Sequence, residues 1–145
     1  MLDDLNLDVS IYGNFVVVAT HFRKFDESMN EYIKVDIPED EEAFKTLEKI
    51  DSPIYEIHKD ENDPELCLIQ KYLPENNDKP ANPLIFIDFY NQLKKLPRKF
   101  RMFEVVTSSW MHLDEEHTGR LDIPVVAVLV DEEEKRICLV ETASN

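Results

Sequence analysis

Residues 123–140, IPVVAVLVDEEEKRICLV, constrain the fold more than any other part of the chain. This apolar run is interrupted once, by the charged residues 131–135. Because valine and isoleucine suit the pleated surface of a sheet, the pattern predicts two buried strands joined in a hairpin. Residues 125–130 are apolar at every position, so we expect that strand to be covered on both faces. The turn lacks Gly and Asn, which favours a four- or five-residue loop built on a type I turn.

Two other segments have the pattern of amphipathic helices. Pro38 precedes four acidic residues, which a helix dipole favours in a first turn, and the apolar residues that follow predict a helix over 38–50. The second helix is predicted over 83–96, with Asn82 as its cap and Pro97 after its end. The loop before it, 73–83, is rich in proline and asparagine.

The remaining segments predict strands. Alternating or β-branched residues give strands at 9–20, 31–37, 54–58, 66–73 and 100–111, with a loop at 113–122 before the terminal hairpin. Runs of strands interrupted by two helices favour an α+β fold. We therefore predict one α+β domain over residues 1–145, a mostly antiparallel sheet of about six or seven strands with two helices packed on one face.

Composition limits where the chain works and what it binds. With 31 acidic and 16 basic residues the formal net charge is −15, which opposes bulk binding to nucleic acid or anionic membrane and favours a basic partner. No apolar run approaches the roughly 20 residues of a membrane span, and the acidic N-terminus does not resemble a secretory signal. Cys67 and Cys138 lie in apolar runs and are predicted to be buried, reduced thiols. These features predict a cytoplasmic protein.

Missing motifs exclude several chemistries. Gly13 and Gly119 are the only glycines, so a P-loop, a dinucleotide fingerprint and a nucleophile elbow are absent. HExxH, CxxC and zinc-finger spacings are absent too. The sequence therefore predicts no cofactor and no metal, and we expect no catalytic residues.

The segment 108–120, SSWMHLDEEHTGR, is the strongest candidate site. It holds the only tryptophan and two of the four histidines beside three consecutive acidic residues. An aromatic anchor inside an acidic rim suits a basic partner, because the rim raises the rate of association and the anchor slows dissociation. The predicted partner-binding residues are Trp110, Met111, His112, Asp114, Glu115, Glu116 and His117.

A catalytic or metal-binding alternative uses part of the same segment. His112, Asp114 and His117 can serve as metal ligands, or as an acid and a base with an orienting carboxylate. The two histidines are five residues apart, which does not place them on one face of a helix.

Residues 94–101, KKLPRKFR, form the only concentrated basic stretch, with five of the 16 basic residues. With Phe100 it could contact a phosphate backbone or an acidic segment. The alternative is structural, because cations at the C-terminal end of a helix complement its dipole.

Together these patterns predict a small acidic, non-enzymatic binding protein that occupies a basic surface of a protein partner. Inhibitors, immunity proteins and antitoxins fit this description, as does a phage-encoded inhibitor that mimics nucleic acid. One alternative is a hydrolase, metal-dependent or using histidine and carboxylate, centred on 108–120. A second is a homodimeric assembly protein, because uncovered strand edges pair readily with a second copy.

Overall fold

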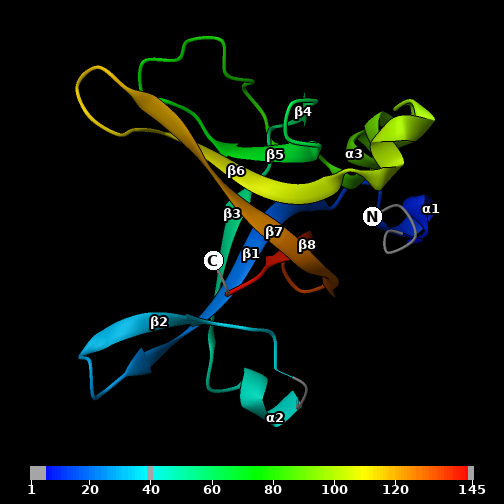
Figure 1. Cartoon of the computed structure of the whole chain (residues 1–145). Coiled ribbons are helices and arrows are strands. Elements are labelled where there is room, and N and C mark those ends of the chain that lie inside the picture. Colours follow the sequence, from blue (N-terminus) through cyan, green and yellow to red (C-terminus); the bar gives the residue numbers. More distant parts are fainter. Residues whose placement is uncertain (1–5, 39–40, 144–145) are drawn as a thin grey trace.

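The computed structural model describes residues 6–38 and 41–143 (Figure 1). Its strands are β1 (Val16–Asp26), β2 (Glu31–Val35), β3 (Glu48–Pro53), β4 (Glu56–Asp60), β5 (Glu65–Lys71), β6 (Glu104–His112), β7 (Thr118–Asp131) and β8 (Arg136–Glu141). Its helices are α1 (Val9–Tyr12), α2 (Glu41–Phe44), α3 (Phe86–Lys94) and the 3-10 helix η2 (Arg98–Met102). None of these helices has the length and apolar composition to cross a membrane.

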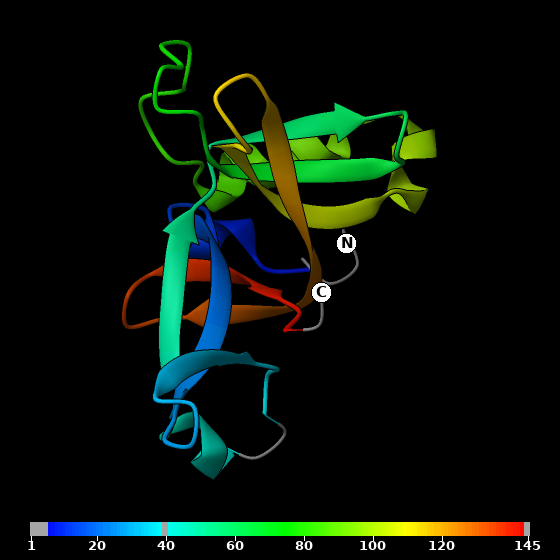
Figure 2. The same cartoon turned by 60° about the vertical axis from the view of Figure 1, so that its left-hand side comes forward.

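The eight strands form one sheet, in the order β2-β1-β8-β7-β6-β5-β4, with β3 paired to β1. Two corners fold this sheet back on itself. The long strand β7 pairs with β6 through its first half and with β8 through its second, and runs diagonally across the molecule (Figures 1 and 2). At the other corner β3 pairs with β1 and β4 with β5, while the amides of Ile54 and Tyr55 between them donate to Val17 and Ile69. The path of paired strands therefore returns to β1.

The α+β class is confirmed, but the sheet is mixed rather than mostly antiparallel. β1 and β8 are parallel, and so are β5 and β6. The segment between β5 and β6 contains α3, which supplies the crossover that adjacent parallel strands require. Hairpin patterns in the sequence predict only pairs of strands that follow one another. They therefore miss both parallel pairings, whose partners are distant in the chain.

One apolar core fills the inside of the folded sheet. β1, β5 and β8 contribute alternate residues, and α3 closes the open side with Phe86, Phe89 and Leu93, which are all buried. Val17 and Ala19 point into this core, as do Ile137 and Leu139. The core is therefore built from the ends of the chain and its middle together.

The helix predicted over 38–50 is wrong. Residues 39–40 lie outside the described part, α2 spans only four residues, and 48–53 is strand β3. Pairing with β1 gives the backbone of residues 48–53 hydrogen bonds and places Ile50 opposite His21. A long-range strand pairing here overrides the helical spacing of the apolar residues.

The prediction of two helices on one face is also wrong. The helix predicted over 83–96 is present, but it begins later, with Ile85 as its cap rather than Asn82. Figure 1 shows α1 beside α3 at one end of the molecule and α2 at the opposite end. Phe44 of α2 contacts the ring of Phe22, with the ring centroids 5.5 Å apart.

The terminal hairpin is confirmed, with a correction to which strand is buried. β8 is buried throughout Ile137–Val140, because β1 and β7 flank it. β7 is only half-buried, and Val126 is 55% exposed beside an irregularity in the pairing. At the other end, 9–12 is a short helix, so the first strand begins at Val16 rather than at residue 9.

Candidate functional site

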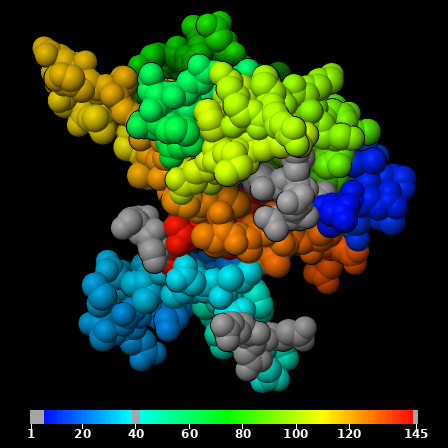
Figure 3. Space-filling model, turned by 45° about the vertical axis from the view of Figure 1, so that its right-hand side comes forward, coloured from blue at the N-terminus to red at the C-terminus, as the bar shows by residue number. Residues whose placement is uncertain are grey.

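The segment 108–120 forms the outer part of an antiparallel hairpin between β6 and β7. Residues 113–117 make the turn, so the loop predicted over 113–122 is shorter than expected and β7 begins at Thr118. The Asp114 carboxylate accepts hydrogen bonds from the amides of Glu116 and His117, each at 2.8 Å, and so holds the turn. This hairpin, gold in Figure 3, projects from the body of the molecule with Glu115 and Glu116 exposed at its tip.

Trp110 lies on the face of β6 that points away from the main core. Alternation along the strand puts Val106 and Ser108 on this face with it, and Val105 and Thr107 on the other. Its half-buried ring covers a small cluster of three buried residues, Cys67, Ile69 and Val106. Met111, on the opposite face, is half-buried and pairs with Gly119.

Four carboxylates lie on the same outer surface of β4–β7 as Trp110. We define the acidic face as Trp110, Asp60, Glu65, Glu104, Asp122 and the single cation Arg120. The Arg120 guanidinium lies 5.6 Å from the centroid of the Trp110 ring. It donates to Asp60 at 2.6 Å and to Asp122 at 2.9 Å, and lies 3.8 Å from Glu65. The hydrogen bond to Asp122, followed by that to Asp60, raises the pKa of Arg120, so this group stays charged.

Among the carboxylates of the acidic face, Glu65 is the one whose negative charge is least compensated by Arg120. Burial and the neighbouring carboxylates Asp122 and Glu104 raise the pKa of Glu65 to about 6. One guanidinium contacts three carboxylates, and Asp60 and Asp122 take its shorter contacts. Glu104, opposite Glu65 on β6, adds a fourth negative charge. A further cation on this face would therefore relieve repulsion that is present in the free protein.

The histidines of the segment bind different carboxylates. Nε2 of His112 lies 2.7 Å from Glu75 in the loop before α3, whereas Nδ1 of His117 lies 2.9 Å from Asp114. All four side chains are at least 44% exposed. His112 therefore pairs with Glu75 rather than with Asp114, whereas the catalytic alternative requires His112, Asp114 and His117 to converge in one cleft.

The basic stretch 94–101 spans the end of α3 and the 3-10 helix η2. Its five cations are exposed, but Phe100 is buried in the core and is not available to stack on a base. Lys99 pairs with Glu61 at 3.2 Å. Figure 1 places this corner beside α3, at the end of the molecule away from the tip of the β6–β7 hairpin.

A buried polar cluster at the end of the core was not predicted. Glu141 points inward, in phase with Ile137 and Leu139 on β8, and is only 4% exposed. Thr107 donates a short hydrogen bond to it, and Gln70 lies 3.4 Å away. Lys34 and His21 lie 3.5 and 3.6 Å from the same carboxylate. Burial lowers the pKa of His21, although Glu141 opposes that shift.

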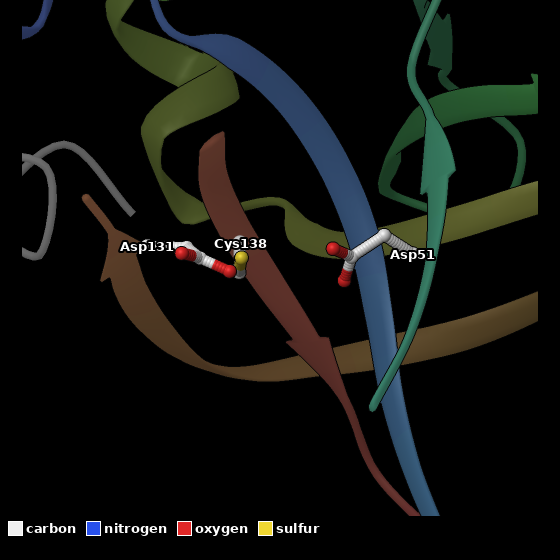
Figure 4. A group of neighbouring side chains, drawn as sticks. All are labelled: Asp51, Asp131 and Cys138. Atoms are coloured by element: carbon white, nitrogen blue, oxygen red, sulfur yellow. The ribbon is translucent and has the colours of Figure 1, made fainter. Parts of the chain in front are cut away.

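A second unpredicted cluster is formed by residues of β3, β7 and β8 (Figure 4). Asp51, Asp131 and Cys138 are close enough to hold a metal ion. Lys49 instead lies between the two carboxylates, 2.8 Å from Asp51 and 2.7 Å from Asp131. Arg136 also donates to Asp51, so this charge is already compensated. Burial raises the pKa of the Cys138 thiol.

The hollows in the described surface include one beside β5 and one beside α2. One, of about 420 Å³, lies between Tyr55, the end of β5 and the loop after it, 72–79. The other, of about 390 Å³, lies between Phe44 of α2 and the β7–β8 turn and reaches Cys138. Neither is lined by His112, Asp114 or His117.

The chain has no detected relative. Comparisons with protein-family models, with curated proteins and with solved structures found no match. The site is therefore interpreted from its own geometry.

Proposed function

We propose that the protein is a non-enzymatic binding protein that occupies a basic surface of a protein partner. The observation that carries this proposal is the acidic face, where one guanidinium beside the half-exposed Trp110 contacts three carboxylates and a fourth, Glu104, lies opposite Glu65. Such an arrangement attracts a cationic group and offers it a flat aromatic surface. The net charge of −15 extends the same attraction over a longer range.

The β6–β7 hairpin supports the proposal through its shape. Its tip carries three consecutive acidic residues, Asp114, Glu115 and Glu116, beyond the body of the molecule (Figure 3). A projecting acidic arm can enter a groove that normally receives a polyanion. The predicted contact residues Met111, His112 and His117 line the same arm.

The elevated pKa of Glu65 indicates that this site favours a cationic group. Neighbouring carboxylates repel the charge that Glu65 carries at neutral pH, so a bound cation would stabilise the ionised form of Glu65. An arginine of the partner would form the charge-assisted hydrogen bonds that Arg120 cannot extend to Glu65. The partner is therefore expected to present arginine or lysine beside an apolar contact for Trp110.

Among classes of protein, an inhibitor, immunity protein or antitoxin fits this chemistry, and so does a phage-encoded mimic of nucleic acid. Each acts by covering the basic groove of an enzyme whose ligand is anionic. The hydrolase alternative gains no geometric support from His112, Asp114 and His117. The homodimer alternative remains a separate prediction, which light scattering over a range of protein concentrations would test.

A titration followed by fluorescence tests the acidic face directly. Trp110 is the only tryptophan, so its emission reports on this face alone. We expect an eight-residue arginine peptide to change the emission, and eight lysines to have a smaller effect because a guanidinium stacks better on indole. Replacing Glu65, Glu104 and Asp122 by their amides should weaken the arginine titration about tenfold.

A control keeps the same change in net charge. Glu132, Glu133 and Glu134 are exposed in the β7–β8 turn, and their replacement by Gln also removes three negative charges. If this control weakens the titration as much as the acidic-face variant does, only net charge matters and the proposed site is wrong.

A further inference from the structure

The hollow of about 420 Å³ differs in chemistry from the rest of this acidic chain. It lies beneath the loop 72–79, which rises beside the tip of the β6–β7 hairpin (Figures 1 and 2). Two lysines, Lys71 and Lys79, line it together with Tyr55 and Tyr72, and no carboxylate is among its lining residues. Its volume lies within the range of small-molecule sites in proteins.

Four carboxylates lie close to this lining in the sequence or the fold, and none is part of it. Asp78, between Asn77 and Lys79, is exposed and makes no ion pair within the described residues. Glu56 accepts a 2.6 Å hydrogen bond from the hydroxyl of Tyr72, and Glu75 pairs with His112. Glu141, behind Gln70, is held by Lys34 and Thr107. The positive charge of the two lysines is therefore not cancelled by an ion pair within the described residues.

The polar groups of the lining are mainly unused donors. In the described part of the chain, the side chains of Lys71 and Asn77 make no hydrogen bond or ion pair. Asn76 uses its carbonyl oxygen to accept from the amide of Asp78, which leaves its NH2 group free to donate. The ammonium of Lys79 lies over the Tyr55 ring, 5.5 Å from the centroid. A set of amide donors and ammonium groups with no carboxylate among them suits an oxyanion.

The tyrosines add a second requirement. Their rings meet edge to face, with centroids 6.1 Å apart and an angle of 69° between the planes. The bond to Glu56 fixes the Tyr72 hydroxyl, and burial together with this carboxylate raises its pKa, so Tyr72 remains a neutral aromatic wall. Aromatic walls of this kind favour a planar ring.

We propose that this hollow binds a small anion that carries a planar ring, of the mononucleotide class. Lys71, Lys79 and the amide groups of Asn76 and Asn77 hold the anionic oxygens, and Tyr55 and Tyr72 contact the ring. The site is distinct from the acidic face and goes beyond the proposed function. Negative charge on the rest of the molecule restricts the hollow to small anions, because a polyanion would meet the acidic hairpin beside it.

The exposed basic stretch 94–101 provides an internal comparison. It carries five cations, more than the hollow does, but has no free aromatic face because Phe100 is buried. An anion that binds only by charge would therefore prefer that stretch. An anion that carries a planar ring and contacts the two tyrosines would instead bind in the hollow.

The test uses three probes, followed by calorimetry and by backbone amide chemical shifts of the full chain. The probes are adenosine 5′-monophosphate, adenosine without the anion, and inorganic phosphate without the ring. We expect the monophosphate to bind about tenfold or more tightly than either fragment and to shift the amides of residues 70–79. The double variant Lys71→Gln with Lys79→Gln should weaken its binding about tenfold or more.

The matched control is Lys95→Gln with Arg101→Gln, which removes two exposed cations from the basic stretch and should change the affinity less than about twofold. The triple variant Asp114→Asn, Glu115→Gln, Glu116→Gln should also keep the monophosphate site, so failure of the proposed function leaves this result unaffected. The inference is overturned if the shifts gather at 94–101, if both double variants lose equal affinity, if phosphate alone binds as tightly, or if no shift occurs at millimolar monophosphate.

Discussion

The guanidinium of Arg120 lies over the indole of Trp110, its direct partner on the neighbouring strand, 5.6 Å from the ring centroid. The same guanidinium binds Asp60 and Asp122 and lies 3.8 Å from Glu65. It therefore connects the only tryptophan of the chain to the carboxylates of three strands. Trp110 is held by packing on one side and by charge on the other, while part of its ring stays exposed.

Replacing Trp110 by alanine is expected to lower the free energy of unfolding by about 2 kcal/mol. The ring covers Cys67, Ile69 and Val106, but it is half-buried, so the loss should be smaller than the ~3–5 kcal/mol of a fully buried aromatic residue. Urea denaturation followed by circular dichroism measures the change, with Trp110→Phe as the conservative control. A loss of about 3 kcal/mol or more would mark Trp110 as a core residue and end its role as an anchor.

Local patterns predicted those parts of the fold that depend on neighbouring residues. The terminal hairpin, β2, β6 and α3 each follow from the spacing of apolar residues within one segment. The parallel pairing of β1 with β8, and the formation of strand β3 where a helix was predicted, both depend on pairing with β1. No local pattern reveals these distant partners. Leu47 and Ile50 have helical spacing, yet 48–53 gains more by pairing with β1.

The site was predictable to the same degree. Alternation along β6 correctly separates Trp110 and Val106 from Val105. Asp60 and Glu65 reach Arg120, the neighbour of Trp110, only because β5 pairs with β6, a contact across the helical crossover. Glu141 could have been noticed as a charge in phase with buried residues of β8, but its partners come from four other strands and their convergence depends on the fold.

Glu65→Gln is expected to stabilise the protein at pH 7 by about 1 kcal/mol. The folded-state pKa of about 6 lies above the ordinary value of 4.5, so the folded protein holds the proton more readily between these pH values. Stability of the parent protein therefore falls as the pH rises from 4.5 to 6, and the variant lacks this loss. The variant should melt at a higher temperature than the parent protein at pH 7, and the two should melt at similar temperatures at pH 4.5. Glu133→Gln, in the exposed β7–β8 turn, serves as the control, and an equal gain from it would show that net charge alone is responsible.

Glu141→Ala is expected to cost about 3 kcal/mol, because Lys34 would lose its buried partner and Thr107 its acceptor. Glu141→Gln keeps an acceptor oxygen and should cost about 1 kcal/mol. Chemical denaturation of the two variants gives both values. Equal and small effects would mean that the cluster contributes little to folding.

Both thiols should be unreactive in the folded protein. Cys67 and Cys138 are fully buried, and burial raises the pKa of each. With Ellman's reagent at pH 8, we expect reaction of two thiols in guanidinium chloride at a rate at least about a hundredfold above that of the native protein. Rapid modification of one thiol in the native protein would instead indicate that its strand opens readily.

The proposed binding to a basic protein is tested most directly by capture from the native host at moderate salt. The full chain is compared with the variant Asp114→Asn, Glu115→Gln, Glu116→Gln and with the control Glu132→Gln, Glu133→Gln, Glu134→Gln, which removes the same charge from another turn. We predict that the parent chain and the control retain one basic protein, that the hairpin variant loses it, and that its affinity for the parent falls as salt rises. Recovery of no basic protein, or equal loss in both variants, would contradict the account.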